Sequence, residues 1–189
     1  MPDELSKLVS DVSSSLAAID ASGARFKDFH PGVGPFGEPQ LVKLIAEKLN
    51  HDYGYSGRAA TKRTPDLLIS GSWAVEVKIA RPFGDNGREA EDWSVNLLHP
   101  YPGNVSVLGD CLKLLDYKGS ERKAVLVIGY EHDPPAIDLS PLFRSFEVIA
   151  SEVLKIQLSE RSESCKKGLI HPVHQLVRVV GWEVLGRAE

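Results

Sequence analysis

The stretch TPDLLISGSWAVEVK, residues Thr64 to Lys78, holds two short apolar runs separated by Ser70-Gly71-Ser72. The runs, residues 66–69 and 73–79, are rich in branched and aromatic side chains and are bounded by turn residues, a pattern typical of paired strands. A three-residue hairpin loop with glycine in its left-handed position fits the spacer between them. The stretch therefore predicts a β-hairpin in which Ile69 lies opposite Trp73.

The predicted register places charged side chains on one face of this hairpin. Paired positions sum to the same number along an antiparallel ladder, so we expect Asp66 opposite Glu76. Side chains alternate between the two faces of a strand, so Lys78 and Ala74 share a face with the two acids. The opposite face carries Leu67, Ile69, Trp73, Val75 and Val77. We expect the apolar face to pack on the core and the charged face to line the edge of a cleft.

Two directly opposed carboxylates destabilise a sheet unless another group neutralises them. Mg²⁺ is held in proteins by one or two carboxylates with water and substrate phosphate, so an ion between Asp66 and Glu76 would turn repulsion into attraction. Lys78 would lie beside the metal-bound water, where an ammonium can orient a nucleophile and neutralise a phosphate. The pattern also fits a plainer interpretation, in which these charges form an ordinary solvated strand face.

Pro65-Asp66 followed by Glu76-Val77-Lys78 on a hairpin resembles the PD-(D/E)xK nuclease superfamily. The resemblance covers residues 36–130 as an order of elements and is sharp only over residues 65–78. It implies a restriction-endonuclease-like fold, an α/β domain of three layers in which helices flank a central mixed β-sheet. It also implies an acid on the preceding helix that joins Asp66 and Glu76 at the metal. Glu38 is expected in that role because helices of this family commonly start with it, and Glu47 is the competing candidate.

By this resemblance we expect a Mg²⁺-dependent deoxyribonuclease, with Mn²⁺ able to substitute, that hydrolyses DNA phosphodiester bonds. The expected catalytic residues are Asp66, Glu76, Lys78 and Glu38. The next helix carries Asp110 and Lys113 where some exonuclease branches have a glutamine, so we expect an endonuclease of restriction or host-defence type. Such enzymes usually act as homodimers. The alternative is a catalytically silent domain of the same fold that binds nucleic acid or another protein.

The rest of the chain predicts further helices and strands around the hairpin. Helical spacing predicts helices over residues 4–19, 39–49 and about 108–115. A fourth helix is expected from Ser140-Pro141, with a buried stripe of Leu142, Phe146, Ile149, Val153 and Ile156. The continuous apolar run over residues 124–130 predicts a central strand buried on both faces. A last strand is expected over residues 175–185, broken by Gly181. We expect one domain over residues 1–189, with the first helix as an extension of its core.

The segment after Ala80 shows no regular pattern for about twenty-five residues and is rich in glycine and proline. Loops of that length inside a compact domain are often functional. The segment directly follows the strand of Lys78, so we expect residues 81–103 to lie over the same cleft and contact substrate. Trp93 and Tyr101 lie within it, where an aromatic ring can stack on a base or pack inside the loop.

Composition sets the outer limits on function. With 189 residues, of which 42% are apolar, the chain is long enough for one buried core. A formal charge of −4 excludes a protein that holds nucleic acid by bulk positive charge, so any DNA contact is expected to be local. The basic residues that cluster near the predicted site are Arg58, Lys62, Arg63, Arg81 and Arg88.

The remaining polar residues concern compartment and alternative metal sites. Cys111 and Cys165 lack metal-ligand spacing and favour a reducing compartment. The chain opens on acidic residues and contains no long apolar run, so we expect a cytoplasmic protein without contact to a membrane. His171 and His174 precede a strand with no acid or cysteine nearby at ligand spacing, so a metal role is not expected of them.

Overall fold

The structure, a computed structural model, describes residues 4–101, 103 and 106–188. The acidic start at residues 1–3, the last residue of the predicted domain, and Pro102 of the long segment lie outside the described residues. The helices are α1 (Leu5–Ala21), α2 (Glu38–Asp52), α3 (Val95–Leu98), α4 (Val107–Asp116), α5 (Ser140–Val148) and the π-helix η1 (Ile149–Val153). The strands are β1 (Ala59–Thr61), β2 (Leu67–Ile69), β3 (Trp73–Ala80), β4 (Arg122–Glu131), β5 (Ile156–Leu158), β6 (Ser162–Lys167) and β7 (Leu176–Arg187).

Over the described residues the seven strands form one mixed sheet in the order β1-β2-β3-β4-β7-β5, and β6 also pairs with β7. β2 and β3 form the predicted antiparallel hairpin, in which Ile69 pairs with Trp73. Gly71 in the turn has a φ of 74°, the left-handed conformation that glycine adopts without strain. β3 and β4 run parallel, whereas β4 and β7 are antiparallel. The predicted hairpin register and the mixed character of the sheet are confirmed.

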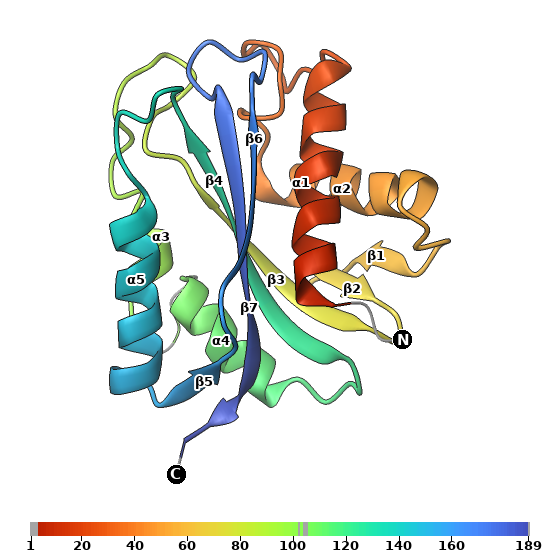
Figure 1. Cartoon of the computed structure of the whole chain (residues 1–189), viewed down its shortest axis with the longest axis vertical. Coiled ribbons are helices and arrows are strands. Elements are labelled where there is room, and N and C mark those ends of the chain that lie inside the picture. The colour runs from red at the N-terminus through yellow and green to blue at the C-terminus, as the bar shows by residue number, and fades with distance from the viewer. Residues whose placement is uncertain (1–3, 102, 104–105, 189) are drawn as a thin grey trace.

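Helices cover both faces of the sheet and give the domain three layers. Figure 1 shows α1 and α2 on one side of the strands and α3, α4 and α5 on the other. The apolar face of the hairpin, with Trp73 and Val75, packs against α1 and α2, while Ala74 faces the cluster of α4 and α5. Among the described residues, no helix combines the length and the apolar character needed to cross a membrane.

β4 lies at the centre of this arrangement, as its apolar sequence predicts. It pairs with β3 along one edge and β7 along the other. Its side chains alternate between the two cores, with Leu126 and Ile128 toward α1 and α2 and with Val125 and Val127 toward α4 and α5. A strand buried on both faces needs apolar residues at every position, and this explains the continuous run.

The predicted helix after Ser140 is correct at its start and wrong at its end. Leu142 and Phe146 are buried on α5, but the chain widens into the π-helix η1 after Val148. Val153 is 63% exposed, and Ile156 belongs to β5 rather than to a helix. Lys155 has a φ of 56°, which ends the helical path and redirects the chain into the strand. The helical spacing of Ile156 is therefore accidental.

Gly181 does not break the last strand, contrary to the prediction. β7 runs without interruption from Leu176 to Arg187, and Gly181 pairs with Leu126 on one side and Ser162 on the other. A Cβ atom at this position would lie 2.5 Å from Leu126 Cδ2 and 2.9 Å from Val9 Cγ2. Glycine is present because α1 packs closely on the sheet here, which is a common reason for glycine inside a strand.

Three strands were not predicted. β1 and β5 are each three residues long, too short for an alternating pattern to show. β6 has the sequence SESCKK and pairs with β7 at an edge of the sheet, where its half-buried positions carry two serines and a lysine instead of apolar side chains. The long segment after Ala80 is also more regular than predicted, since it contains α3 and a bridge between Phe83 and Glu89.

Candidate functional site

The candidate site forms where β3 extends beyond its hairpin partner. β2 pairs only with Trp73–Val75, whereas β4 pairs with β3 from Trp73 to Ala80. In the part of the chain that the structure describes, no strand continues the hairpin side of β3 from Glu76 onward. Asp66, which precedes β2, fills the first position instead, because its Oδ2 accepts a hydrogen bond of 2.9 Å from the Val77 backbone N–H. Polar side chains line the rest of this open edge.

Asp66 and Glu76 lie side by side at the start of the open edge, as the register predicts. Glu76 is only 3% exposed, and its Oε1 is buried without a hydrogen-bond partner among the described residues. Burial raises the pKa of Glu76 to about 8, and the neighbouring Asp66 acts in the same direction through its charge and through side-chain hydrogen bonding. The pair therefore holds one carboxyl group whose ionised form is destabilised.

Lys78, two residues along the same face, lies between two further acids. Its Nζ is 3.2 Å from Glu38 Oε1 and 3.1 Å from Asp110 Oδ2. The contact with Glu38 is a hydrogen bond, whereas Asp110 Oδ2 accepts no hydrogen bond and the contact there is an ion pair. Burial acts to lower the pKa of Lys78, but the charges of Asp110 and Glu38 outweigh it, and the pKa lies above its ordinary value. Lys78 is thus a charged ammonium in a fixed position.

Asp110 and Lys113 belong to the site, and sequence analysis noted them only as a departure from a family pattern. Asp110 is fully buried on α4, and its Oδ1 accepts a hydrogen bond of 2.5 Å from Lys113 Nζ. An acid on the buried face of an amphipathic helix requires a partner, because an unpaired buried charge is costly. The spacing of the aspartate and the lysine, one turn apart, was the available signal.

Of the two candidate acids on α2, Glu38 lies at the open edge of β3 and Glu47 does not. Glu38 is the first residue of α2, and its side chain reaches Lys78 from the face of the sheet opposite to α4. Burial raises the pKa of Glu38, although the positive charge of Lys78 opposes the shift. Glu47 lines a separate hollow with Ile19 of α1 and does not reach the open edge of β3. Of the two candidates that the sequence leaves open, the geometry favours Glu38.

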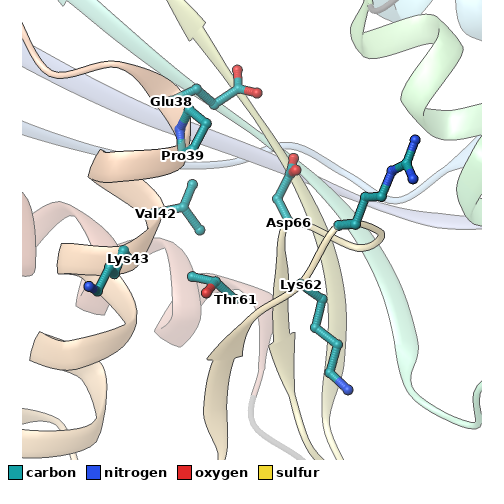
Figure 2. Close-up of a pocket in the computed structure, with 8 residues that line it drawn as sticks. Glu38, Pro39, Val42, Lys43, Thr61, Lys62 and Asp66 are labelled. Atoms are coloured by element: carbon teal, nitrogen blue, oxygen red, sulfur yellow. The ribbon is translucent and has the colours of Figure 1, made fainter.

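A cavity of about 390 Å³ opens beside Asp66, between α2 and the turn that leads from β1 to β2. Figure 2 shows the side chains of Glu38, at the start of α2, and of Asp66, just before β2, at the same end of this cavity, while Lys62 points away from both carboxylates. Lys43 and Arg63 also line the cavity. Two carboxylates and three basic side chains therefore share one concave surface.

The structure separates the five basic residues that sequence analysis grouped together. Lys62 and Arg63 line the cavity at Asp66, whereas Arg81 lines a second cavity next to Glu38. Arg88 is exposed in the long segment. Arg58 lies in neither cavity, because its Nη1 donates to Ser72 Oγ at 3.2 Å and its guanidinium lies 5.7 Å from the centre of the Tyr55 ring. Arg58 therefore supports the hairpin.

A second polar cluster lies at the other end of the long segment. Among the described residues, His30, Asp85 and His171 are the group whose possible metal-ligand atoms all lie within 4.8 Å of one another. Asp85 Oδ1 is 2.8 Å from His171 Nε2, and Asp85 Oδ2 is 3.0 Å from His30 Nδ1. The sequence carries no acid at ligand spacing from His171, but folding brings Asp85 to it from a distant part of the chain.

The hydrogen bonds of this cluster are complete without a metal. His171 Nδ1 accepts from the backbone N–H groups of Val173 and His174 at 3.1 and 3.0 Å, so its ring proton lies on Nε2 and is donated to Asp85. A metal at Nε2 would require the proton on Nδ1, where it would oppose two other N–H groups. The cluster instead ties the long segment to the loop before β7 and to the loop between α1 and α2, and its hydrogen bonds lower the pKa of Asp85 to about 2.

The neighbouring His174 leads to a prediction about acid stability. Its Nε2 is 2.8 Å from the Phe83 carbonyl oxygen, and its Nδ1 is buried without a partner among the described residues. Burial lowers the pKa of His174 to about 3. Because the unfolded chain takes up this proton near pH 6.5 and the folded chain does not, stability should fall by about 1.4 kcal/mol per pH unit as the pH drops below 6.5.

Urea unfolding of the wild type and of His174→Gln between pH 4 and 7.5 checks this prediction. Glutamine can still donate to Phe83 but does not titrate, so the stability difference between the two proteins should shrink or reverse as the pH falls. Comparing the two proteins at each pH cancels the titration of all other groups. A difference that stays constant across this range would contradict the prediction.

No family model, no curated protein and no solved structure matches this chain. The residues at the open edge of β3 are compatible with a divalent cation, because Glu76 Oε1 is buried without a partner beside a second carboxylate. The Glu38 side chain points toward Lys78. Among the described residues, Glu38, Asp66 and Glu76 do not bring three possible ligand atoms within 4.8 Å of one another.

Proposed function

We propose that this chain is a Mg²⁺-dependent deoxyribonuclease with a restriction-endonuclease-like fold, and that it cleaves DNA internally. The observation that carries the proposal is the pairing of Asp66 with the buried Glu76, with Lys78 on the same face of an open strand edge. Hydrolysis of a phosphodiester requires groups that hold a metal, groups that hold water and groups that neutralise the phosphate. These three residues can supply all of them within one site.

Asp66 and Glu76 are the residues that would hold the metal, with Glu38 as an accessory ligand or water-binding residue. A bound Mg²⁺ supplies Lewis acidity toward the phosphate and makes a water molecule more acidic. Asp66 is itself positioned by the Val77 backbone N–H. The raised pKa of Glu76 is consistent with a cation-binding site, because a bound cation would stabilise the ionised carboxylate.

Lys78 acts in this proposal as a hydrogen-bond donor and as a positive charge, not as a base. Asp110 and Glu38 keep its ammonium protonated at neutral pH and fix its position from both faces of the sheet. A fixed ammonium can hold the attacking water and offset negative charge as it develops on the phosphate. Lys62, Arg63 and Lys43 line the adjoining cavity, where they can bind neighbouring phosphates of the DNA.

The restriction or host-defence role, homodimer formation and a cytoplasmic location are the parts of the proposal that rest on family resemblance. The geometry itself supports a second candidate, a catalytically silent domain of the same fold that binds nucleic acid or protein. Its supporting observation is that Lys78 already has two carboxylate partners, so this ion network is complete without a metal. Calorimetric titration with Mn²⁺ separates the two candidates, because the silent domain has no need to bind the ion through Glu76.

The proposal predicts that Lys78→Met abolishes cleavage and keeps metal binding. An ammonium near a bound cation repels it, so its removal does not weaken metal affinity by Coulomb interaction. Methionine has a similar length and can pack in the same space. Cleavage of plasmid, linear and branched DNA with Mg²⁺ and Mn²⁺ should fall by about 10²-fold or more, the usual size of a lost charge-stabilising group.

Lys7→Met is the matched control, since Lys7 is an exposed lysine of α1 that pairs with Asp11 away from the site. It should cleave DNA as the wild type does. If Lys78→Met cleaved DNA at the wild-type rate, Lys78 would have no part in the reaction. If the wild type cleaved none of the substrates with either metal, the nuclease proposal would be abandoned for the silent domain.

A further inference from the structure

A second cavity, of about 380 Å³, adjoins the first at Glu38. Its walls come from three segments, namely the start of α2, the end of β3 and the long segment after it. The residues that line it include Glu38, Ile79, Arg81, Glu91, Trp93 and Asn96. The volume falls within the range of roughly 300–1,000 Å³ that is typical of small-molecule pockets. The two cavities thus meet at Glu38, whose carboxylate accepts a hydrogen bond from Lys78 Nζ.

Arg81 is a cation in this cavity that lacks an acidic partner among the described residues. Its Nη2 donates to the Phe36 carbonyl oxygen at 2.8 Å, and its Nε is buried without any partner. The guanidinium lies 5.7 Å from the centre of the Tyr130 ring, and the two acids that line the cavity, Glu38 and Glu91, form no ion pair with it among the described residues. Burial lowers the pKa of Arg81. Because a half-buried cation without a counter-ion is unfavourable, the site favours an anion that enters the cavity.

Trp93 gives the same cavity an aromatic surface. Its ring is half-buried and packs in part against the core on the side of α4 and α5, while it also lines the cavity. The other two tryptophans, Trp73 and Trp182, are 0% and 1% exposed. An accessible ring beside an unpaired arginine is the combination that binds single-stranded nucleic acid, because a base can stack on the ring while the guanidinium takes the phosphate.

We propose that this second cavity binds one unpaired nucleotide next to the cleavage site, with its phosphate on Arg81 and its base on Trp93. This inference rests on the proposed nuclease function and specifies its substrate. In a duplex the base is stacked and paired, and it must be extruded at a free-energy cost before it can reach Trp93. The cavity therefore selects a single-stranded segment, a frayed end or a flap over an intact duplex.

Tryptophan fluorescence of the whole protein, measured without metal, tests the inference directly. The probe is the 5′-phosphorylated dinucleotide of thymidine, and Trp93 is the tryptophan able to report on it. We expect saturable quenching in the wild type. Arg81→Gln should require about tenfold more dinucleotide for half-saturation, as expected when a charge-assisted hydrogen bond is lost. Arg81→Lys should lie between the two, since it keeps the charge but not the fork of donors.

Further titrations identify which chemical groups of the ligand and of the protein produce the quenching. Thymidine without phosphate and inorganic phosphate without a base should each bind more weakly than the dinucleotide. In Trp93→Phe the quenching should disappear, because the remaining tryptophans are buried. Arg144 is an exposed arginine of α5, and Arg144→Gln is the matched control. The dinucleotide should quench its fluorescence with the same half-saturation as in the wild type. Thermal melts check that each variant is folded.

Three results would overturn the inference: no quenching in the wild type, unchanged affinity in Arg81→Gln, or quenching that persists in Trp93→Phe. A short duplex that competes as well as a single strand of the same sequence would overturn the preference for unpaired DNA. Because these titrations need no cleavage, they separate the two proposals. Quenching without nuclease activity would remove the proposed function alone, and cleavage without quenching would remove the subsite alone.

Discussion

Replacing Glu76 with glutamine is expected to abolish Mn²⁺ binding and to lower the rate of DNA cleavage by about 10³-fold, the size of several kcal/mol of lost charge stabilisation. Glutamine keeps the volume of the side chain but removes the charge that a divalent ion requires. Asp66→Asn should behave in the same way, because the two carboxylates act on one ion. Calorimetric Mn²⁺ titration and plasmid cleavage measure the two effects separately.

The same substitution is expected to stabilise the metal-free protein. The pKa of Glu76 is raised to about 8 in the folded state, against about 4.5 in the unfolded chain. The folded state therefore retains a proton that the unfolded state has lost, and stability falls as the pH rises from about 4.5 to about 8. Glutamine removes this loss, so Glu76→Gln should gain a few kcal/mol over the wild type at pH 8 and little at pH 4.5. Urea unfolding at both pH values measures the gain.

Glu131→Gln is the matched control for the loss of Mn²⁺ binding and of cleavage. Glu131 is also a buried strand glutamate, 3% exposed, and burial raises its pKa, but it faces Arg178 rather than Asp66. Its replacement should leave Mn²⁺ binding and cleavage unchanged. Saturating Mn²⁺ should raise the melting temperature of the wild type and of Glu131→Gln but not of Glu76→Gln. Wild-type cleavage by Glu76→Gln would end the nuclease assignment at this site.

Replacing Gly34 with alanine is expected to destabilise the fold by about 3 kcal/mol, at the upper end of the usual cost of overpacking. A Cβ atom at this position would lie 2.2 Å from His174 Nδ1 and 2.6 Å from its Cβ. His174 cannot move away, because it is 1% exposed, hydrogen-bonded to Phe83 and stacked on His171 with ring centres 4.3 Å apart. Thermal unfolding should show a melting temperature lower by roughly 6–12 °C.

Gly119→Ala is the matched control, because it creates a similar close approach next to a side chain that can move. Its Cβ would lie 2.2 Å from Tyr117 Oη, but Tyr117 is only half-buried, and its ring can turn toward solvent with the loss of one hydrogen bond, to Glu121. We expect a change within about 0.5 kcal/mol, as for most surface substitutions. Equal losses in the two variants would show that the confinement of His174 is not the cause.

The central part of the fold could be predicted because its determinants are local. The turn at Gly71 sets the hairpin register, and the alternation along Trp73–Ala80 sets which side chains share a face. The continuous apolar run of β4 indicates burial on both faces wherever the strand lies in the sheet. β6 could not be predicted, since its polar residues pair with β7 through backbone groups that any sequence carries.

By itself the sequence determined that Asp66 and Glu76 lie next to each other, with Lys78 two residues further along β3, because turn length and strand alternation are properties of one hairpin. The tertiary structure alone decided which groups complete the site. Glu38 reaches Lys78 from one face of the sheet and Asp110 from the other, and Asp85 meets His171 across the long segment. A residue pattern indicates which face of its own helix or strand a side chain lies on. Which side chain from another element contacts it depends on how the helices pack on the sheet and on where β2 ends.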